Sequence, residues 1–459
     1  MSVSISVSAA SIACAPPSGG IRVVAPDGLC LAGIRAGTSA DEAADGVKDP
    51  AILRQAGLVD IPVHVLKLAK HSVRMLRALA STNLIYAVCE PPDTPHVNWL
   101  VVWNVSAAQA VRAVSLPGTV RSMAVNLTAC LLCMSNGDLR VHDTSTLELR
   151  CTYVGECAEP GLCCSAAVAG PAAFAGTKPG STAGYVNLLS NPNKYERQAF
   201  TIECHARPIS ALAMDASGRR LATASEDGRL VKLWEISGVQ TARPTAALLC
   251  KFRRGSTPAA VRLLRFESPP LEALVACATS HMRQLAASPD YSGTRTSPTD
   301  LPAAHMLVAL NEGKGSYHML LAPGAPGVPV SSRAPPAAPA ARAPAPKGVG
   351  SWLSGQMFSV AKGAYKSVSS VVAGEPRAVA VLRLSAGQPI VDMAISATEF
   401  PGQFQVLAVD RTGMLRVHLV RSPPRAGGTW DSTLHRTLNL DWPQSTGQPP
   451  HSRAGFEHS

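Results

Sequence analysis

The sequence predicts an all-β protein whose sheets close into a β-propeller, and three observations support this prediction. The segment from His205 to Trp234 contains three strand patterns, separated by the turns Asp215-Ala-Ser-Gly218 and Glu226-Asp-Gly228. The 36 glycines, 37 prolines and 46% hydrophobic residues suit many short strands connected by turns. The chain of 459 residues also has the length for about seven repeats of ~40 residues each.

The chain before His205 contains a tail, an inserted loop and a series of predicted strands. The Ser- and Ala-rich range 1–20 is interpreted as a flexible N-terminal tail, with a plastid transit peptide as the alternative. The range 38–60 is small, acidic and weakly periodic, which indicates an inserted loop. Before the repeat, strands are predicted at 21–24, 29–33, 73–76, 82–88, 98–103, 120–125, 129–134, 139–142, 161–163 and 184–188.

Two insertions interrupt the pattern after the repeat. Residues 280–302 are polar, and 323–347 are rich in Pro and Ala, which predicts disordered or polyproline-II-like chain. The second insertion continues to residue 372, and 441–459 are expected to form a flexible C-terminal tail. Strands are predicted at 260–266, 273–278, 313–321 and 377–384, with a hairpin at 406–419. One propeller over 21–440 therefore accounts for the chain.

The formal net charge of +11 predicts an anionic partner, either nucleic acid or an acidic membrane surface. Aromatic residues are only 5% of the chain and lie mostly in predicted strands, which disfavours nucleic acid. No run of 18 apolar residues is present, so no membrane-spanning helix is expected. No nucleophile elbow, phosphate-binding Walker loop or persuasive acid–base pair is found, so neither an enzyme nor catalytic residues are predicted.

The twelve cysteines lie mostly in apolar runs. Cys130 and Cys133 have the spacing of a zinc or redox pair, but no second pair follows at that spacing. We therefore expect buried strand thiols in a reducing compartment, with no metal and no cofactor.

Two adjacent arginines, Arg253 and Arg254, follow the repeat in the stretch Lys251-Phe-Arg-Arg-Gly255. Consecutive strand side chains point to opposite faces, so each arginine could serve a different pocket. Guanidinium groups match the geometry of phosphate oxygens. The arginine pair, together with Ala222-Thr-Ala-Ser-Glu-Asp-Gly228, resembles the PROPPIN family, β-propellers that bind polyphosphoinositides. The resemblance is clear over 83–266 and implies a seven-bladed WD40-like β-propeller with inserted disordered loops.

The resemblance implies two headgroup pockets on the rim of the propeller. The residues of the first would be His205, Thr223, Ser225, Gly228, Lys232 and Arg253, and those of the second would be Arg254, Ser316 and His318. This chain has Arg229 where the family has Thr, and Lys232 where it has Arg. In the second pocket, Asn311 and Glu312 replace family serines. Without the arginine pair, ordinary hairpin turns and a structural histidine would explain the first set.

Residues 352–372 carry apolar side chains at three- and four-residue steps with lysines opposite, which predicts an amphipathic helix. The resemblance implies that this segment inserts into the bilayer. The residues expected at the membrane are Trp352, Leu353, Met357, Phe358, Val360, Lys362, Tyr365 and Lys366. The alternatives are a helix packed on the propeller or a disordered segment, because Gly355 and Gly363 weaken helix propensity.

The function that the resemblance implies is that of a non-enzymatic effector. It would bind PtdIns3P, with PtdIns(3,5)P2 as a second candidate ligand, and would support autophagosome formation. It would act in the cytoplasm, peripherally on phagophore, endosomal or vacuolar membranes, with autophagy proteins on the free rim and no nucleic acid. The alternative is a WD-type protein-interaction scaffold without lipid binding, which the altered second pocket favours weakly.

Overall fold

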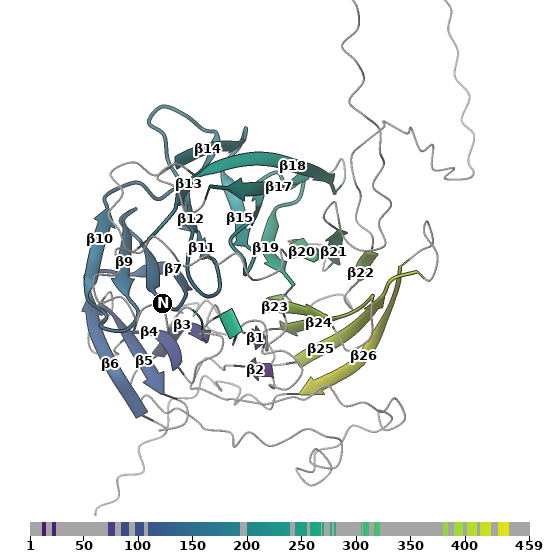
Figure 1. The fold of residues 1–459 in the computed structure, drawn as a ribbon. Coiled ribbons are helices and arrows are strands. Elements are labelled where there is room, and N and C mark those ends of the chain that lie inside the picture. Colours follow the sequence, from purple (N-terminus) through teal and green to yellow (C-terminus); the bar gives the residue numbers. More distant parts are fainter. Residues whose placement is uncertain are drawn as a thin grey trace, which may run out of the picture.

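The computed structural model describes residues 12–14, 21–23, 72–78, 84–90, 97–104, 109–192, 200–238, 244–254, 258–267, 269, 276–277, 280, 304, 306–311, 316–321, 380–383, 390–397, 402–410, 414–423 and 430–439. These residues form six four-stranded antiparallel sheets and one two-stranded sheet. Figure 1 shows the sheets arranged around a common centre, as in a β-propeller. The predicted all-β propeller of seven sheets is confirmed.

Successive stretches of the chain form successive sheets. The first sheet pairs β1 (Ile12–Cys14) with β2 (Ile21–Val23). The second contains β3 (Ser72–Ala78), β4 (Leu84–Glu90), β5 (Asn98–Asn104) and β6 (Gln109–Leu116). The third contains β7 (Val120–Val125), β8 (Ala129–Met134), β9 (Leu139–Asp143) and β10 (Leu149–Tyr153).

The remaining sheets continue in the same order. The fourth contains β11 (Cys163–Ser165), β12 (Ala172–Gly176), β13 (Gly184–Leu189) and β14 (Phe200–His205). The fifth contains β15 (Ile209–Met214), β16 (Arg220–Ser225), β17 (Leu230–Ser237) and β18 (Thr245–Arg253). The sixth contains β19 (Val261–Phe266), β20 (Met306–Asn311), β21 (Ser316–Leu321) and β22 (Ala380–Arg383). The seventh contains β23 (Ile390–Ala397), β24 (Gln403–Asp410), β25 (Met414–Arg421) and β26 (Asp431–Asn439).

The two-stranded first sheet completes the ring. Figure 1 places β1 and β2 between β3 and β23, and β1 contacts β23. The strand β1 lies within the range predicted as an N-terminal tail. Strand structure therefore begins before residue 21, because the apolar residues Ile12 and Cys14 pair with Val23 and Ile21 of β2.

The inner strand β8 is covered on one face by the second sheet and on the other by the fourth. All six residues of β8 are buried, as expected for a continuous apolar run between two packed sheets. The fifth sheet divides its side chains in the same way. Leu221 and Trp234 pack with residues of the fourth sheet, whereas Ala222 and Phe252 pack with residues of the sixth. This alternation decides which sheet each polar residue of the fifth sheet faces.

The turns between the first two strands of several sheets are joined by hydrogen bonds. The Leu127 amide donates to the Val168 carbonyl at 2.8 Å, and the Ala167 amide donates to the Ala216 carbonyl at 3.0 Å. Beside them, the Ala304 amide donates to Asp215 Oδ2 at 3.2 Å. These bonds link the third to the sixth sheet along one side of the ring.

One predicted strand is wrong. Residues 273–278 were expected to be the second strand of the sixth sheet, but β20 takes that place and pairs with β19. Residues 276–277 are helical, and Cys277 packs against Val168 and Ala169. A short apolar run can belong to a strand or to a buried helical turn, and periodicity alone cannot separate the two. The strand β12 was not predicted, because all its residues except Phe174 are alanine or glycine and none is β-branched.

Several predictions fall outside the described residues. They are most of the tail at 1–20, the strand at 29–33, the insertions at 38–60 and 323–372 with the helix at 352–372, almost all of 280–302, and the tail at 441–459. The domain boundaries accordingly stay predictions. In the described ranges, no helical segment has the length and apolar character needed to cross a bilayer. The hairpin expected at 406–419 is confirmed by β24 and β25.

Candidate functional site

The register of the fifth sheet brings polar residues from three strands to one face. Lys232 on β17 lies opposite Thr223 on β16 and opposite Lys251 on β18. Paired residues share a face with residues two positions away, so Ser225 and Arg253 lie on this face as well. Because Leu221 and Trp234 belong to the same face, it is directed toward the fourth sheet.

A surface pocket of about 440 Å³ opens between the fourth and fifth sheets. Four of the residues predicted for the first headgroup pocket line it: His205, Ser225, Lys232 and Arg253. Its lining also contains three charged residues outside that predicted set: Arg207, Asp227 and Arg229. The pocket thus combines four basic side chains with one carboxylate.

Thr223 and His205 form a buried hydrogen-bonded group at the inner side of the pocket. Thr223 is fully buried, and its Oγ1 accepts a hydrogen bond from Trp234 Nε1 at 3.1 Å. His205 Nε2 lies 3.0 Å from the same oxygen. Burial lowers the pKa of His205 to about 4, so the ring is neutral near pH 7. These two residues hold β14 against β16 and add no positive charge.

The turn between β16 and β17 uses its own polar groups internally. Ser225 Oγ donates to Asp227 Oδ1 at 2.6 Å, and the Gly228 amide donates to the Ser225 carbonyl at 2.8 Å. Gly228 has φ of +54°, and a Cβ there would collide with the Ala259 carbonyl oxygen. A glycine is therefore required at this position. Its amide serves the turn, whereas the basic side chains around the turn face the pocket.

Lys232 is held in place at the pocket wall. Its Nζ donates to the Cys204 carbonyl and lies 6.0 Å from the centre of the Trp234 ring. Burial lowers the pKa of Lys232, and the charge of Lys251 lowers it further. Arg253, at the end of β18, is exposed to solvent at the mouth of the pocket.

Arg254 lies on the other side of the fifth sheet. Phe252 packs toward the sixth sheet, and Arg254, two residues later, is directed the same way. Its Nε donates to the Gly228 carbonyl at 2.6 Å and its Nη2 to the Ala259 carbonyl at 2.9 Å. Burial lowers the pKa of the guanidinium. Arg254 thereby ties the β16–β17 turn to the chain that enters the sixth sheet.

The other two residues predicted for the second pocket lie on β21. Ser316 pairs with Asn311 on one side and with Arg383 on the other. Asn311 in turn pairs with Val261, two residues beyond the Ala259 carbonyl that Arg254 contacts. The backbone thus places Ser316 at the end of the sixth sheet where Arg254 binds, and His318 two residues further along β21. The side chains of Ser316 and His318 lie outside the described part, as do all eight residues predicted for membrane insertion.

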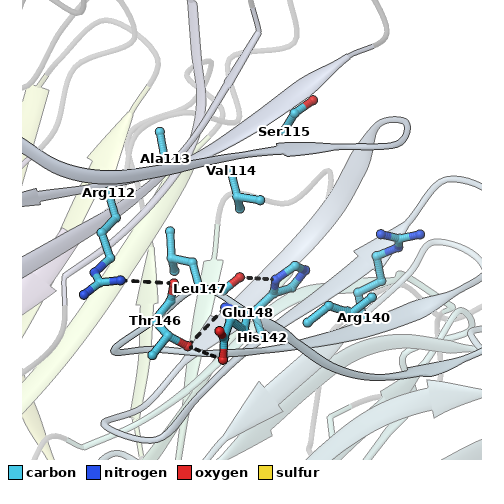
Figure 2. A pocket seen from close by; sticks show the side chains of 10 residues that line it. Arg112, Ala113, Val114, Ser115, Arg140, His142, Thr146, Leu147 and Glu148 are labelled. Carbon is cyan, nitrogen blue, oxygen red and sulfur yellow. Dashed lines mark hydrogen bonds between the residues drawn. The ribbon is translucent and has the colours of Figure 1, made fainter.

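A second pocket of about 460 Å³, which the sequence did not predict, lies between the second and third sheets. Figure 2 shows Arg112 of β6 directed toward the β9–β10 turn, where its Nη1 donates to the Thr146 carbonyl at 3.3 Å. His142 Nδ1 donates to the Leu147 carbonyl at 2.9 Å, and burial lowers the pKa of this ring. Arg140 lines the same pocket, and exposed Leu149 lies beside it. We call this pocket the β6–β10 groove.

Neither pocket has the donor set of a metal centre. Within the described residues, no group of three or more His, Cys, Asp or Glu side chains could hold a metal ion. Most of the described cysteines are buried, and burial raises the pKa of thiols such as Cys204 to about 12. Both pockets are instead characterised by arginines.

Comparison with known proteins finds relatives in part of the chain. No protein-family model matches it. The chain is 28% identical over 141 residues to WD repeat domain phosphoinositide-interacting protein 2 of Xenopus laevis, covering 31% of this chain and 30% of the relative. It is 38% identical over 78 residues to Autophagy-related protein 18 of Phaeosphaeria nodorum, covering 17% of each. The match thus spans less than a third of these relatives' length.

Solved structures share the fold over nearly the whole chain. Hsv2p of Kluyveromyces lactis superposes with a TM-score of 0.55 at 11% identity, covering 94% of this chain and 99% of Hsv2p. KlAtg21, solved in a complex with the coiled-coil of AgAtg16, superposes with a TM-score of 0.52 at 14% identity, covering 93% and 95%. At these identities the likeness concerns the fold alone.

Proposed function

We propose that this member of the PROPPIN family of β-propellers is a non-enzymatic effector that binds phosphoinositides on membranes. Its ligands are PtdIns3P and PtdIns(3,5)P2, both bound through the pocket between the fourth and fifth sheets. It acts in the cytoplasm, peripherally on phagophore, endosomal or vacuolar membranes, and supports autophagosome formation.

The observation that carries this proposal is the charge of the pocket between the fourth and fifth sheets. Arg207, Arg229, Lys232 and Arg253 line it, with Asp227 as the single carboxylate. A phosphomonoester carries about −1.5 to −2 charge at pH 7 and offers three acceptor oxygens. Arginine and lysine donate charge-assisted hydrogen bonds to such oxygens. A phosphorylated headgroup is therefore the ligand that this pocket fits best.

A single pocket on a rim gives limited affinity for a membrane. We propose a second contact at the end of the sixth sheet, through Arg254, Ser316 and His318, and a third through the helix expected at 352–372. Contacts on one surface reinforce each other through effective concentration. Arg254 already donates hydrogen bonds to the Gly228 and Ala259 carbonyls. Its first role is therefore to position the backbone beside both pockets, and headgroup binding is its second role.

The β6–β10 groove is the surface that we propose for protein partners. It presents Arg112 and Arg140 together with exposed apolar side chains such as Leu149, which is 47% exposed. Arginines beside apolar contacts favour a protein segment with acidic residues. An autophagy protein that docks there would leave the headgroup pocket open. The same groove supports the alternative function, that of a protein-interaction scaffold without lipid binding.

The proposal is tested by co-sedimentation of the full chain with liposomes that contain or lack PtdIns3P. The informative variant is Arg253→Gln, because Arg253 is exposed and lines the pocket. Arg421→Gln, at an exposed arginine of β25, is the matched control. We expect the wild-type chain to bind only the liposomes that contain PtdIns3P. Arg253→Gln should weaken this binding by about tenfold or more, because one charge-assisted contact is lost. Arg421→Gln should bind as the wild-type chain does. Wild-type protein that ignores the lipid would favour the scaffold.

A further inference from the structure

We infer that Arg207 and Arg229 form a second phosphate subsite inside the pocket between the fourth and fifth sheets. The pocket then prefers a headgroup with two phosphomonoesters over a headgroup with one. This inference rests on the proposed function and specifies which headgroup the pocket selects. Neither arginine belongs to the set that the family resemblance assigned to headgroup binding, and Arg229 replaces a family threonine.

Arg207 is fixed by the turn between β14 and β15. The backbone of this turn approaches Gly184 so closely that a Cβ on Gly184 would collide with the Arg207 carbonyl oxygen. His205, two residues earlier, is anchored to Thr223. The backbone of Arg207 is therefore well positioned, while its side chain is exposed at the pocket. Within the described part of the chain, its guanidinium makes no hydrogen bond or ion pair that would hold it elsewhere.

Arg229 enters the pocket from the opposite side. It follows Gly228 in the turn between β16 and β17, and its carbonyl accepts a hydrogen bond from the Arg254 amide at 2.9 Å. Its side chain is exposed and lines the same pocket as Arg207. Among the residues that the structure describes, no hydrogen bond or ion pair engages this guanidinium either. The two arginines thus face one pocket from two sheets, with both forks available to an anion.

The charge of the site exceeds what one phosphomonoester can balance. Lys232 and Arg253 on adjacent strands are sufficient for about two negative charges. Lys251, directly opposite Lys232, adds another positive charge on the same face. Like charges opposite each other in a sheet are unfavourable unless an anion lies between or beside them. Arg207 and Arg229 raise this surplus further, whereas Asp227 is the only carboxylate in the lining.

The basic groups of the pocket belong to two different parts of the fold. Lys232 and Arg253 belong to the wall built by β17 and β18. Arg207 and Arg229 belong to the two turns that border the pocket. We therefore assign the first phosphate to the wall and the second phosphate to the turns. Guanidinium forks are well suited to such bidentate contacts.

The experiment measures the affinity of the full chain for soluble dibutanoyl PtdIns3P and dibutanoyl PtdIns(3,5)P2 by titration calorimetry. The two probes share the diester and differ in one phosphomonoester. We expect the wild-type chain to bind the bisphosphate at least about tenfold more tightly. Arg229→Thr and Arg207→Gln should each reduce this ratio, and the double variant should bring it close to one. Arg421→Gln should leave the ratio unchanged.

The outcomes separate this inference from the proposed function. Equal affinity of the wild-type chain for both probes, or an equal loss for both in Arg229→Thr, would overturn the subsite and leave lipid binding intact. Failure to bind either probe would overturn both. A parallel titration with inositol 1,3,5-trisphosphate shows whether the lipid glycerol is needed. Tight binding of this free inositol phosphate with the same dependence on Arg207 and Arg229 would confirm the subsite and identify a soluble source for its ligand.

Discussion

Lys232 and Lys251 lie directly opposite each other on β17 and β18, in a sheet that could have placed opposite charges or apolar side chains there. The pKa of Lys232 is lowered by burial and by the charge of Lys251. Two opposed lysines repel each other in the absence of an anion, and both attract an anion that binds beside them. We therefore expect the pair to lower the stability of the ligand-free protein and to favour the binding of an anion.

Replacing Lys251 should stabilise the ligand-free protein. We expect Lys251→Thr to raise the free energy of unfolding by about 0.2–1 kcal/mol at low salt, because the opposed charge is removed. The gain should shrink as added salt screens the charges. Urea denaturation at two ionic strengths measures both effects, with Arg262→Thr, an exposed position on β19, as the control for strand propensity. A loss of stability in Lys251→Thr would show that the two lysines do not oppose each other in solution.

The two adjacent arginines should differ in their effect on stability. Arg254→Gln removes charged donors from the Gly228 and Ala259 carbonyls, so we expect a loss of about 1–3 kcal/mol in the free energy of unfolding. Arg253→Gln, at an exposed side chain, should change it by less than about 0.5 kcal/mol. Chemical denaturation of the two single variants makes the comparison. Equal stability of both variants would contradict the structural role of Arg254. If Arg254→Gln is the less stable variant, a double variant at Arg253 and Arg254 would lose stability as well as lipid contacts, so it could not report lipid binding alone.

Much of the fold was predictable because short-range patterns determine it. Short apolar segments bounded by polar turn residues predicted β7, β8 and β9 closely. The pattern failed where residue type was uninformative, as in the alanine-rich strand β12. It also failed at 273–278, because the pairing of β19 with β20 across a long insertion depends on contacts distant in sequence.

The candidate site was predictable only in part. Strand alternation predicted that Arg253 and Arg254 point to opposite sides, and the structure places them so. No local signal showed that Arg254 would bind the Ala259 carbonyl, because that contact depends on how the chain enters the sixth sheet. Arg207 had one weak signal, its position in the turn after His205. Its inclusion in the pocket depends on the packing of the fourth sheet against the fifth.

His205 should make stability depend on pH. Its pKa is about 4 in the folded protein, against an ordinary value of 6.5. Between pH 4 and pH 6.5, His205 binds a proton in the unfolded chain but not in the folded protein. The contribution of neutral His205 to the free energy of unfolding is therefore present above pH 6.5 and is lost as the pH falls toward 4. From pH 7.5 to pH 5, we expect His205 to account for a loss of about 2 kcal/mol.

The variant His205→Gln isolates this effect, because it keeps a hydrogen-bonding side chain without titration in this range. Burial also lowers the pKa of His142 and His418, and these residues remain in the variant. The measurement is the difference in unfolding free energy between pH 7.5 and pH 5 for each protein. Identical differences in the two proteins would mean that the pKa of His205 is the same in the folded and unfolded states.

Gly228 should be the glycine at the site that tolerates substitution least. It has φ of +54°, and a Cβ there would collide with the Ala259 carbonyl oxygen. Gly155 is a matched control, because its φ is +66° but a Cβ there would meet nothing within 4 Å. Gly155→Ala should cost only the left-handed backbone conformation, about 1–2 kcal/mol. Gly228→Ala should cost about 1–3 kcal/mol more, because the backbone around it must move.

The same movement should weaken headgroup binding, since the Gly228 carbonyl is a hydrogen-bond acceptor for Arg254 and the turn carries Arg229 into the pocket. Thermal unfolding and liposome co-sedimentation of Gly228→Ala and Gly155→Ala measure the two effects together. We expect Gly155→Ala to bind PtdIns3P liposomes as wild type does and Gly228→Ala to bind them less tightly at a temperature where both are folded. If both variants lost the same stability and kept full binding, the contact between Gly228 and Ala259 would not govern the shape of the pocket. The expected divergence would instead show that one close backbone approach determines both the stability of the fifth sheet and the position of its arginines.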